Sequence, residues 1–206
     1  MRFPKAYAGV KKILLSEIIN TIAYALYLFI YLYYFFVDID ADNSDFMALL
    51  FGLIDLMFMF ISLFSFLLCF IGMIQALKDE HLFKKAIIFS IVGIIASAIF
   101  YFAHGMFGNI FSGISTIATL LTTIYIILAF FNLARKLDNN QMERRGKIVI
   151  LTLTVVLVIS FLSSIISIFA PEIEIILSLL SIELDLFGHL IFITYLASTH
   201  KILAQK

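Results

Sequence analysis

The sequence predicts an all-α polytopic integral membrane protein with six transmembrane helices, and two observations carry this prediction. The 206-residue chain is 63% hydrophobic and has a mean hydropathy of +1.11, whereas ordinary soluble domains are about half apolar. All 14 Lys and Arg residues fall in four short stretches, which alternate with long apolar runs and span residues 2–12, 78–85, 135–147 and 201–206. Six spans with short connections use nearly the whole chain, so we expect a single transmembrane domain, 1–206.

The expected spans follow from the apolar runs, because a helix needs about 20 apolar residues to cross the hydrocarbon. The first and second spans flank the acidic segment 38–45, the third and fourth flank the polar turn 104–109, and the fifth and sixth meet at Pro171. In order, the spans are 13–37, 46–77, 86–103, 110–134, 148–170 and 173–200. The long second and sixth runs tilt or project outward; alternatively, residues 172–181 lie along the outer interface.

The distribution of charge predicts that both ends of the chain lie in the cytoplasm, because basic residues that flank membrane spans are kept on the cytoplasmic side. That side carries all 14 basic residues and five acidic ones, while the outer side carries the other nine acidic residues. We therefore expect a multi-pass protein of the cell membrane whose main partner is the lipid bilayer. The basic clusters are small and adjoin the membrane, which suits anionic lipid and argues against nucleic acid as a partner.

A weak internal repeat divides the chain into three tandem helical hairpins, near 1–79, 80–139 and 140–206. Each odd-numbered helix opens on a pair of basic residues, which are Lys11-Lys12, Lys84-Lys85 and Arg144-Arg145. The alternative is that every inward-facing helix end needs basic anchors, which imitates repetition.

The first span carries a polar stripe that runs from its inner to its outer end. Its members recur every three or four residues and therefore share one face of the helix; they are Glu17, Asn20, Tyr24, Tyr27, Tyr31, Tyr34 and Asp38. Polar groups in a membrane usually face the interior of a bundle. The stripe predicts either the wall of a pathway for a solute or ion, or a buried seam whose hydroxyl groups bond to neighbouring helices.

The last span carries the sharpest cluster of ionisable residues, Asp185 and His189, which are four residues apart and share a face. At about 1.5 Å per residue from Lys201, His189 is expected near the middle of the membrane, and Asp55 is expected at the outer boundary. Such carboxylates orient an imidazole and raise its proton affinity, so the cluster predicts a site that holds a cation or relays a proton. The alternative is a satisfied Asp–His pair, and Glu17 is expected to be shallow and paired with a basic anchor.

No sequence motif indicates an enzyme. The chain has no zinc signature, nucleophile elbow or phosphate-binding glycine loop, so we predict no cofactor and no catalytic residue, and whether a metal binds is left open. The sequence is best interpreted as a transporter, or a membrane-embedded substrate-binding subunit, that handles a small solute or cation.

Two other functions fit the sequence. One is a non-catalytic membrane scaffold or accessory subunit that docks other membrane or cytoplasmic subunits through its basic loops. The other is a membrane-embedded hydrolase or transferase that uses Asp185 and His189.

Overall fold

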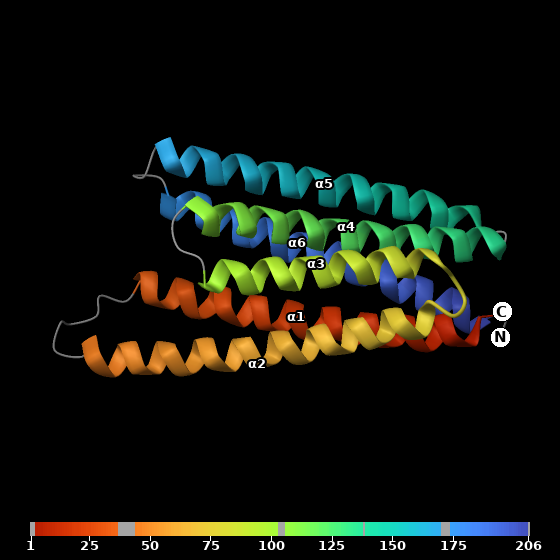
Figure 1. The fold of residues 1–206 in the computed structure, drawn as a ribbon, viewed down its shortest axis with the longest axis horizontal. Coiled ribbons are helices and arrows are strands. Elements are labelled where there is room, and N and C mark those ends of the chain that lie inside the picture. Colours follow the sequence, from red (N-terminus) through yellow and green to blue (C-terminus); the bar gives the residue numbers. More distant parts are fainter. Residues whose placement is uncertain (1–2, 37–43, 103–105, 138, 170–173, 206) are drawn as a thin grey trace.

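The computed structural model describes residues 3–36, 44–102, 106–137, 139–169 and 174–205, which form an all-helical bundle. Its helices run alternately up and down, so that both termini lie at the same end (Figure 1). In chain order they are α1 (Pro4–Phe36), α2 (Ser44–Ala76), α3 (Leu82–Phe102), α4 (Met106–Lys136), α5 (Asn140–Phe169) and α6 (Glu174–Gln205). The prediction of an all-α chain with six helices is confirmed.

Five of the six helices are long and apolar enough to cross a membrane, which indicates a multi-pass membrane protein. The qualifying stretches are Pro4–Ile30, Gly52–Ala76, Leu82–Phe100, Gly113–Lys136 and Leu186–Ala204. The remaining expected span, 148–170, extends into a part of α5 whose side chains lie largely outside the described residues, and it stays a prediction.

The helices begin several residues before the expected spans at the end that holds the termini. Helices α1, α3 and α5 begin at Pro4, Leu82 and Asn140, whereas the apolar runs begin at 13, 86 and 148. Hydropathy marks only the part of a helix that is apolar, while the helical hydrogen bonds continue into the charged turns. At the other end, α6 is continuous from Glu174, so residues 174–181 belong to the same helix as the stretch that follows. Whether they lie along the membrane interface stays a prediction.

The helices contact one another in cyclic order, with α6 closing the ring against α1. The contacts between α1 and α2 and between α3 and α4 are the most extensive, and α5 packs on α6, so each expected hairpin is a pair of adjacent helices. Whether the three hairpins are repeats of one unit stays a prediction.

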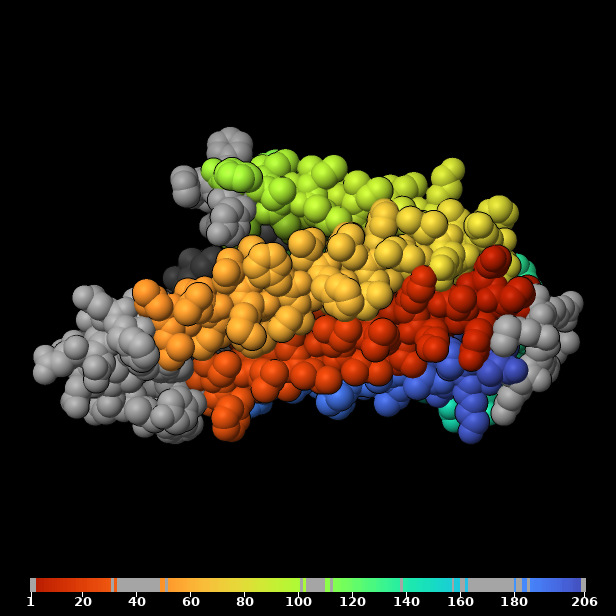
Figure 2. All heavy atoms as spheres, turned by 90° about the horizontal axis from the view of Figure 1, so that it is seen from below, coloured from red at the N-terminus to blue at the C-terminus, as the bar shows by residue number. Residues whose placement is uncertain are grey.

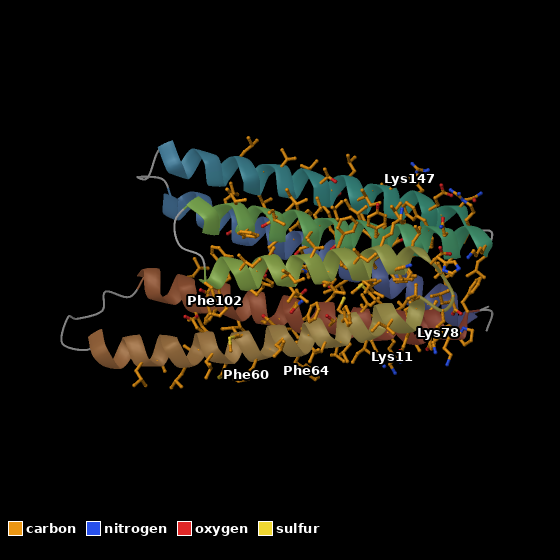
Figure 3. All side chains as sticks on the ribbon, in the orientation of Figure 1. Lys11, Phe60, Phe64, Lys78, Phe102 and Lys147 are labelled. Carbon is orange, nitrogen blue, oxygen red and sulfur yellow. The ribbon has the colours of Figure 1, made fainter. Side chains whose placement is uncertain are left out.

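The packed core of the bundle lies at the end that holds the termini, which we call the closed end. Its buried side chains include Val10, Ile13, Phe83, Phe130 and Leu196, all within a few turns of a basic stretch. Lys11, Lys78 and Lys147 gather at this same end (Figure 3).

Polar contacts tie the connecting turns of the closed end to the helices. Asp79 accepts a hydrogen bond from the Ala6 amide of α1, at 2.6 Å, and a carboxylate at a helix N-terminus stabilises the helix dipole. Glu80 accepts hydrogen bonds from Lys136, at 2.7 Å, and from Asn132, at 3.3 Å, so the turn between α2 and α3 is tied to α4.

The contact between α1 and α2 follows small residues that are seven apart. Gly9 faces Gly72, and Ser16 faces Ser65, so the paired positions keep one antiparallel register along both helices. Each serine hydroxyl donates to the backbone carbonyl of the other serine, at 2.8 and 2.7 Å. Small residues let helices approach closely within a membrane, and hydroxyls bond across the seam, so this register is fixed by both packing and hydrogen bonds.

The ion pair of Glu80 predicts a dependence of stability on pH. Burial would raise the pKa of Glu80, but hydrogen bonds from Lys136, Asn132 and the Leu82 amide outweigh burial and lower this pKa below its ordinary value of 4.5. A lowered carboxyl pKa stabilises the folded state above the ordinary pKa, and this stabilisation is lost as the pH falls through the folded value. Glu80→Gln is expected to lower the free energy of unfolding by about 1 kcal/mol at pH 7, and the difference should shrink below pH 4.5.

Glu143→Gln is the matched control for Glu80→Gln. Glu143 also accepts hydrogen bonds, from Lys147 and Arg135, which lower its pKa, but both basic side chains are well exposed. Solvent weakens such pairs, so we expect a smaller loss of stability. The free energy of unfolding would be measured by circular dichroism in detergent. Equal losses in the two variants would contradict a larger contribution of Glu80 than of Glu143 to stability.

Candidate functional site

Glu17 and His189 form an ion-pair contact between the first and the last helix. The Glu17 carboxylate oxygen Oε2 lies 2.9 Å from His189 Nδ1. The side chains are 13% and 27% exposed respectively, so the pair is largely enclosed by the bundle. Tyr24, two turns along α1 from Glu17, stacks on the His189 ring with 5.2 Å between the ring centroids.

Helix α2 packs against the part of α1 that carries Glu17. Ser16 precedes Glu17 and is held against Ser65 of α2 by the hydrogen bonds described above. The Cys69 side chain of α2 lies close enough to Ser16 and to Glu17 to interact with both. The position of Glu17 is therefore determined by packing against α2, and its partner is provided by α6.

The expectation that Glu17 pairs with a basic anchor is wrong, because its partner in the structure is His189, while its shallow depth in the membrane stays a prediction. In the structure Tyr7 stacks on His200, with 4.5 Å between the ring centroids, so the end of α6 is level with Tyr7. Glu17 lies ten residues, or about 15 Å, beyond that level. Lys11 and Lys12 therefore lie on α1 between this level and Glu17.

The tyrosines of the α1 stripe contact two different neighbouring helices. Tyr24 contacts His189 of α6, whereas Tyr27 meets Phe58 of α2 edge-on, with 5.3 Å between the ring centroids. Asn20 is partly buried on the same face. The side chains of Tyr31 and Tyr34, and residue Asp38, lie outside the described residues.

The interior face of α1 changes from buried to exposed along its length. Residues 18 apart on a helix are five whole turns apart and point in the same direction. Ala6 and Gly9 are buried at the closed end, yet Tyr24 and Tyr27, which are 18 residues further on, are 45% and 40% exposed. The opposite face of α1 carries apolar residues such as Ile22, so the tyrosines are exposed on the interior side.

Two further helices show the same change. On α2, Met73 is fully buried, and Asp55, 18 residues away on the same face, is exposed. On α4, Phe130 is buried and Thr119, three turns away on the same side of the helix, is exposed. The Phe130 ring packs on Phe83 of α3 and lies near Tyr195 of α6, so this side of α4 faces the interior of the bundle.

Among the described residues, interior faces of α1, α2 and α4 therefore carry exposed polar side chains in the half away from the termini. We call this half the vestibule and define it by Tyr24, Tyr27, Asp55 and Thr119, with Glu17 and His189 at its inner limit. Figure 2 shows the surface hollowed between α2 and α3 in this half, while the same two helices meet near the closed end.

The structure separates some of the predicted site residues. In the register of the α1–α2 seam, Asp55 is level with residue 26 of α1, about 13 Å along the axis from Glu17. Among the described contacts Asp55 makes none with His189. The side chain of Asp185 lies outside the described residues, so the expected Asp185–His189 pair stays a prediction.

The arrangement suits small positive charges more than multivalent metal ions. In the part of the chain that the structure describes, no three His, Cys, Asp or Glu side chains are grouped so that they could hold a metal. A carboxylate beside an imidazole can instead hold or pass on a proton.

No protein-family model, curated protein or solved structure matches this chain.

Proposed function

We propose that the protein handles a small solute or cation, as a transporter or as the membrane-embedded substrate-binding subunit of one. In this proposal it lies in the cell membrane with both termini in the cytoplasm, and the vestibule opens to the outside. The closed end then separates the bound solute from the cytoplasm.

One observation carries the proposal: faces of α1, α2 and α4 that are buried at the closed end become exposed and polar in the vestibule. In a closed seam between helices, polar side chains would be buried against their neighbours, whereas these Tyr, Asp and Thr side chains are exposed, and polar groups exposed to hydrocarbon are costly. Such residues are accommodated where they line a water-filled or ligand-filled space.

The charge of the outer half favours a cation as the solute. Residues 13–77, 86–134 and 148–200 contain no Lys or Arg at all, while nine acidic residues lie between Asp38 and Asp185 in the expected outer half. Clefts lined by one sign of charge raise the local concentration of ions of the opposite sign. Positive solutes are therefore drawn toward the vestibule.

The test is a search for bound small molecules by mass spectrometry of the purified protein, followed by uptake of the identified molecules into proteoliposomes. The double variant Asp185→Asn/His189→Gln should abolish binding or uptake. Glu183→Gln is the matched control, since Glu183 is an exposed carboxylate on another face of the same helix. Unchanged activity in the double variant would remove both residues from the mechanism.

A scaffold or accessory subunit is the second candidate, because basic side chains at the closed end are exposed. Lys84, Lys85, Arg144 and Arg145 all present their side chains outward at the starts of α3 and α5. Reversing these four charges should release any subunit that copurifies with the wild type in a pull-down. A partner that is retained would count against docking through these residues.

A further inference from the structure

We infer that Glu17 and His189 form a site for one proton, and that a monovalent organic cation entering the vestibule displaces this proton. The inference rests on the proposed function and deepens it: it names the class of solute as an ammonium-type cation and the coupled ion as the proton.

The geometry of the pair determines how many protons the site can exchange for a cation. With one proton between Glu17 Oε2 and His189 Nδ1, 2.9 Å apart, the carboxylate and the imidazolium together carry no net charge. Loss of that proton leaves one negative charge in a largely enclosed site, which is costly in a medium of low dielectric constant. The site therefore releases its proton readily only when another positive charge takes its place.

The exchange balances in both charge and protons. The cation C⁺ arrives beside the Glu17 carboxylate, the N–H bond of the imidazolium breaks, and the proton passes to water in the vestibule. His189 is left neutral, the carboxylate faces C⁺, and the site again carries no net charge. No bond to the cation is formed, so the step needs no other reactant.

Aromatic rings beside the pair favour an organic cation over a metal ion. Tyr24 lies on His189, and one turn further on Tyr27 meets Phe58, so three rings lie at the inner part of the vestibule. Aromatic faces attract ammonium groups and are the usual means of recognising quaternary ammonium. The part of the chain described by the structure offers no three-ligand cluster for a metal.

Other groups that bear on the charge of the pair come from all three helices around it. Cys69 of α2 lies near Glu17, and Tyr24 and Tyr27 belong to α1 itself. Asp55 lies further out on α2. Asp185 lies one helical turn from His189 on α6, with its side chain outside the described residues. None of these five side chains can carry a positive charge, so none of them competes with a cation for the Glu17 carboxylate.

The experiment adds benzyltrimethylammonium to the wild-type protein in weakly buffered detergent solution and follows the pH with an indicator dye. This probe carries a permanent charge and no exchangeable proton, so any proton released comes from the protein. We expect about one proton per bound cation in the wild type and in Glu183→Gln, and none in Glu17→Gln. The neutral analogue benzyl alcohol should release none.

A second measurement uses only the wild type, so that it does not depend on how well a variant folds. Because proton and cation compete for one site, the affinity for benzyltrimethylammonium should fall about tenfold for each unit by which the pH is lowered. An affinity independent of pH, binding without proton release, or no binding of this cation would each overturn the inference. If the protein nevertheless binds or takes up another solute in the search described above, the proposed function stands without proton exchange.

Discussion

His189→Leu is expected to lower the free energy of unfolding by about 2–3 kcal/mol, because it leaves the Glu17 carboxylate enclosed without its partner. Glu17 is 13% exposed and lies 2.9 Å from His189, and removing one member of a buried pair typically costs about 3–5 kcal/mol. His189 is partly exposed, and solvent weakens the pair, so we expect a loss of stability at or below the lower end of that range. The double variant Glu17→Leu/His189→Leu should regain most of the loss, since apolar residues of similar volume often replace such pairs at no cost.

The two variants separate stability from function. Unfolding by SDS from mild detergent, followed by circular dichroism, should show a stable double variant, while binding and uptake in that variant should be lost. A double variant less stable than His189→Leu would contradict the ion-pair contact. A stable double variant that keeps full binding would show that the pair is structural only.

Gly9→Ala is expected to destabilise the protein by about 1–2 kcal/mol, because the added methyl group meets backbone rather than a movable side chain. A Cβ at Gly9 falls against the Gly72 carbonyl oxygen and within 2.9 Å of Ala76 Cβ, so α1 and α2 must separate. Overpacking of this kind costs about 1–3 kcal/mol, against which alanine gains about 1 kcal/mol in helix propensity. Separation would also weaken the Ser16–Ser65 hydrogen bonds, two turns further along the same seam.

Gly52→Ala on α2 is the control for this prediction. A Cβ at Gly52 meets no atom within 4 Å, so the substitution should leave stability unchanged or raise it slightly. Melting temperatures measured by circular dichroism in the same detergent compare the two variants directly. Equal melting temperatures would mean that α1 and α2 do not approach as closely as the structure has them.

The helices were predictable from the sequence because the bilayer constrains each one locally. An apolar run of about 20 residues and a basic end define a span without reference to any other part of the chain. Helix ends were less predictable. Helices α1 and α5 begin at Pro4 and Asn140, several residues before their apolar runs, so hydropathy does not mark where the helical hydrogen bonds begin. The continuity of α6 through residues 174–181 also could not be derived from composition, since Glu174 and Glu183 interrupt the apolar run.

The partnership of Glu17 and His189 could not be predicted, because the two residues are 172 positions apart. Which residue of α6 lies beside Glu17 depends on the position of α1 along its axis relative to α6. That shift is set by contacts at the closed end, such as Tyr7 on His200 and the Ala6 amide on Asp79. Spacing within one helix pointed correctly to the shared face of Glu17 and Tyr24, but it carries no information about the register between helices.

The most direct test of the account is the accessibility of the vestibule to a water-soluble reagent. Single cysteines at Tyr27→Cys and Ile22→Cys, in a Cys69→Ser background, would be treated in sealed proteoliposomes with a membrane-impermeant trimethylammonium methanethiosulfonate. An epitope tag at the C-terminus would report which way the protein faces.

Tyr27 and Ile22 are both well exposed, at 40% and 56%, but on opposite sides of α1. We predict that the cysteine at 27 is labelled from the side opposite the termini, while the cysteine at 22 faces lipid and is not labelled. Protection of position 27, its labelling only from the side of the termini, or equal labelling of both positions would contradict a polar vestibule that ends at Glu17 and His189.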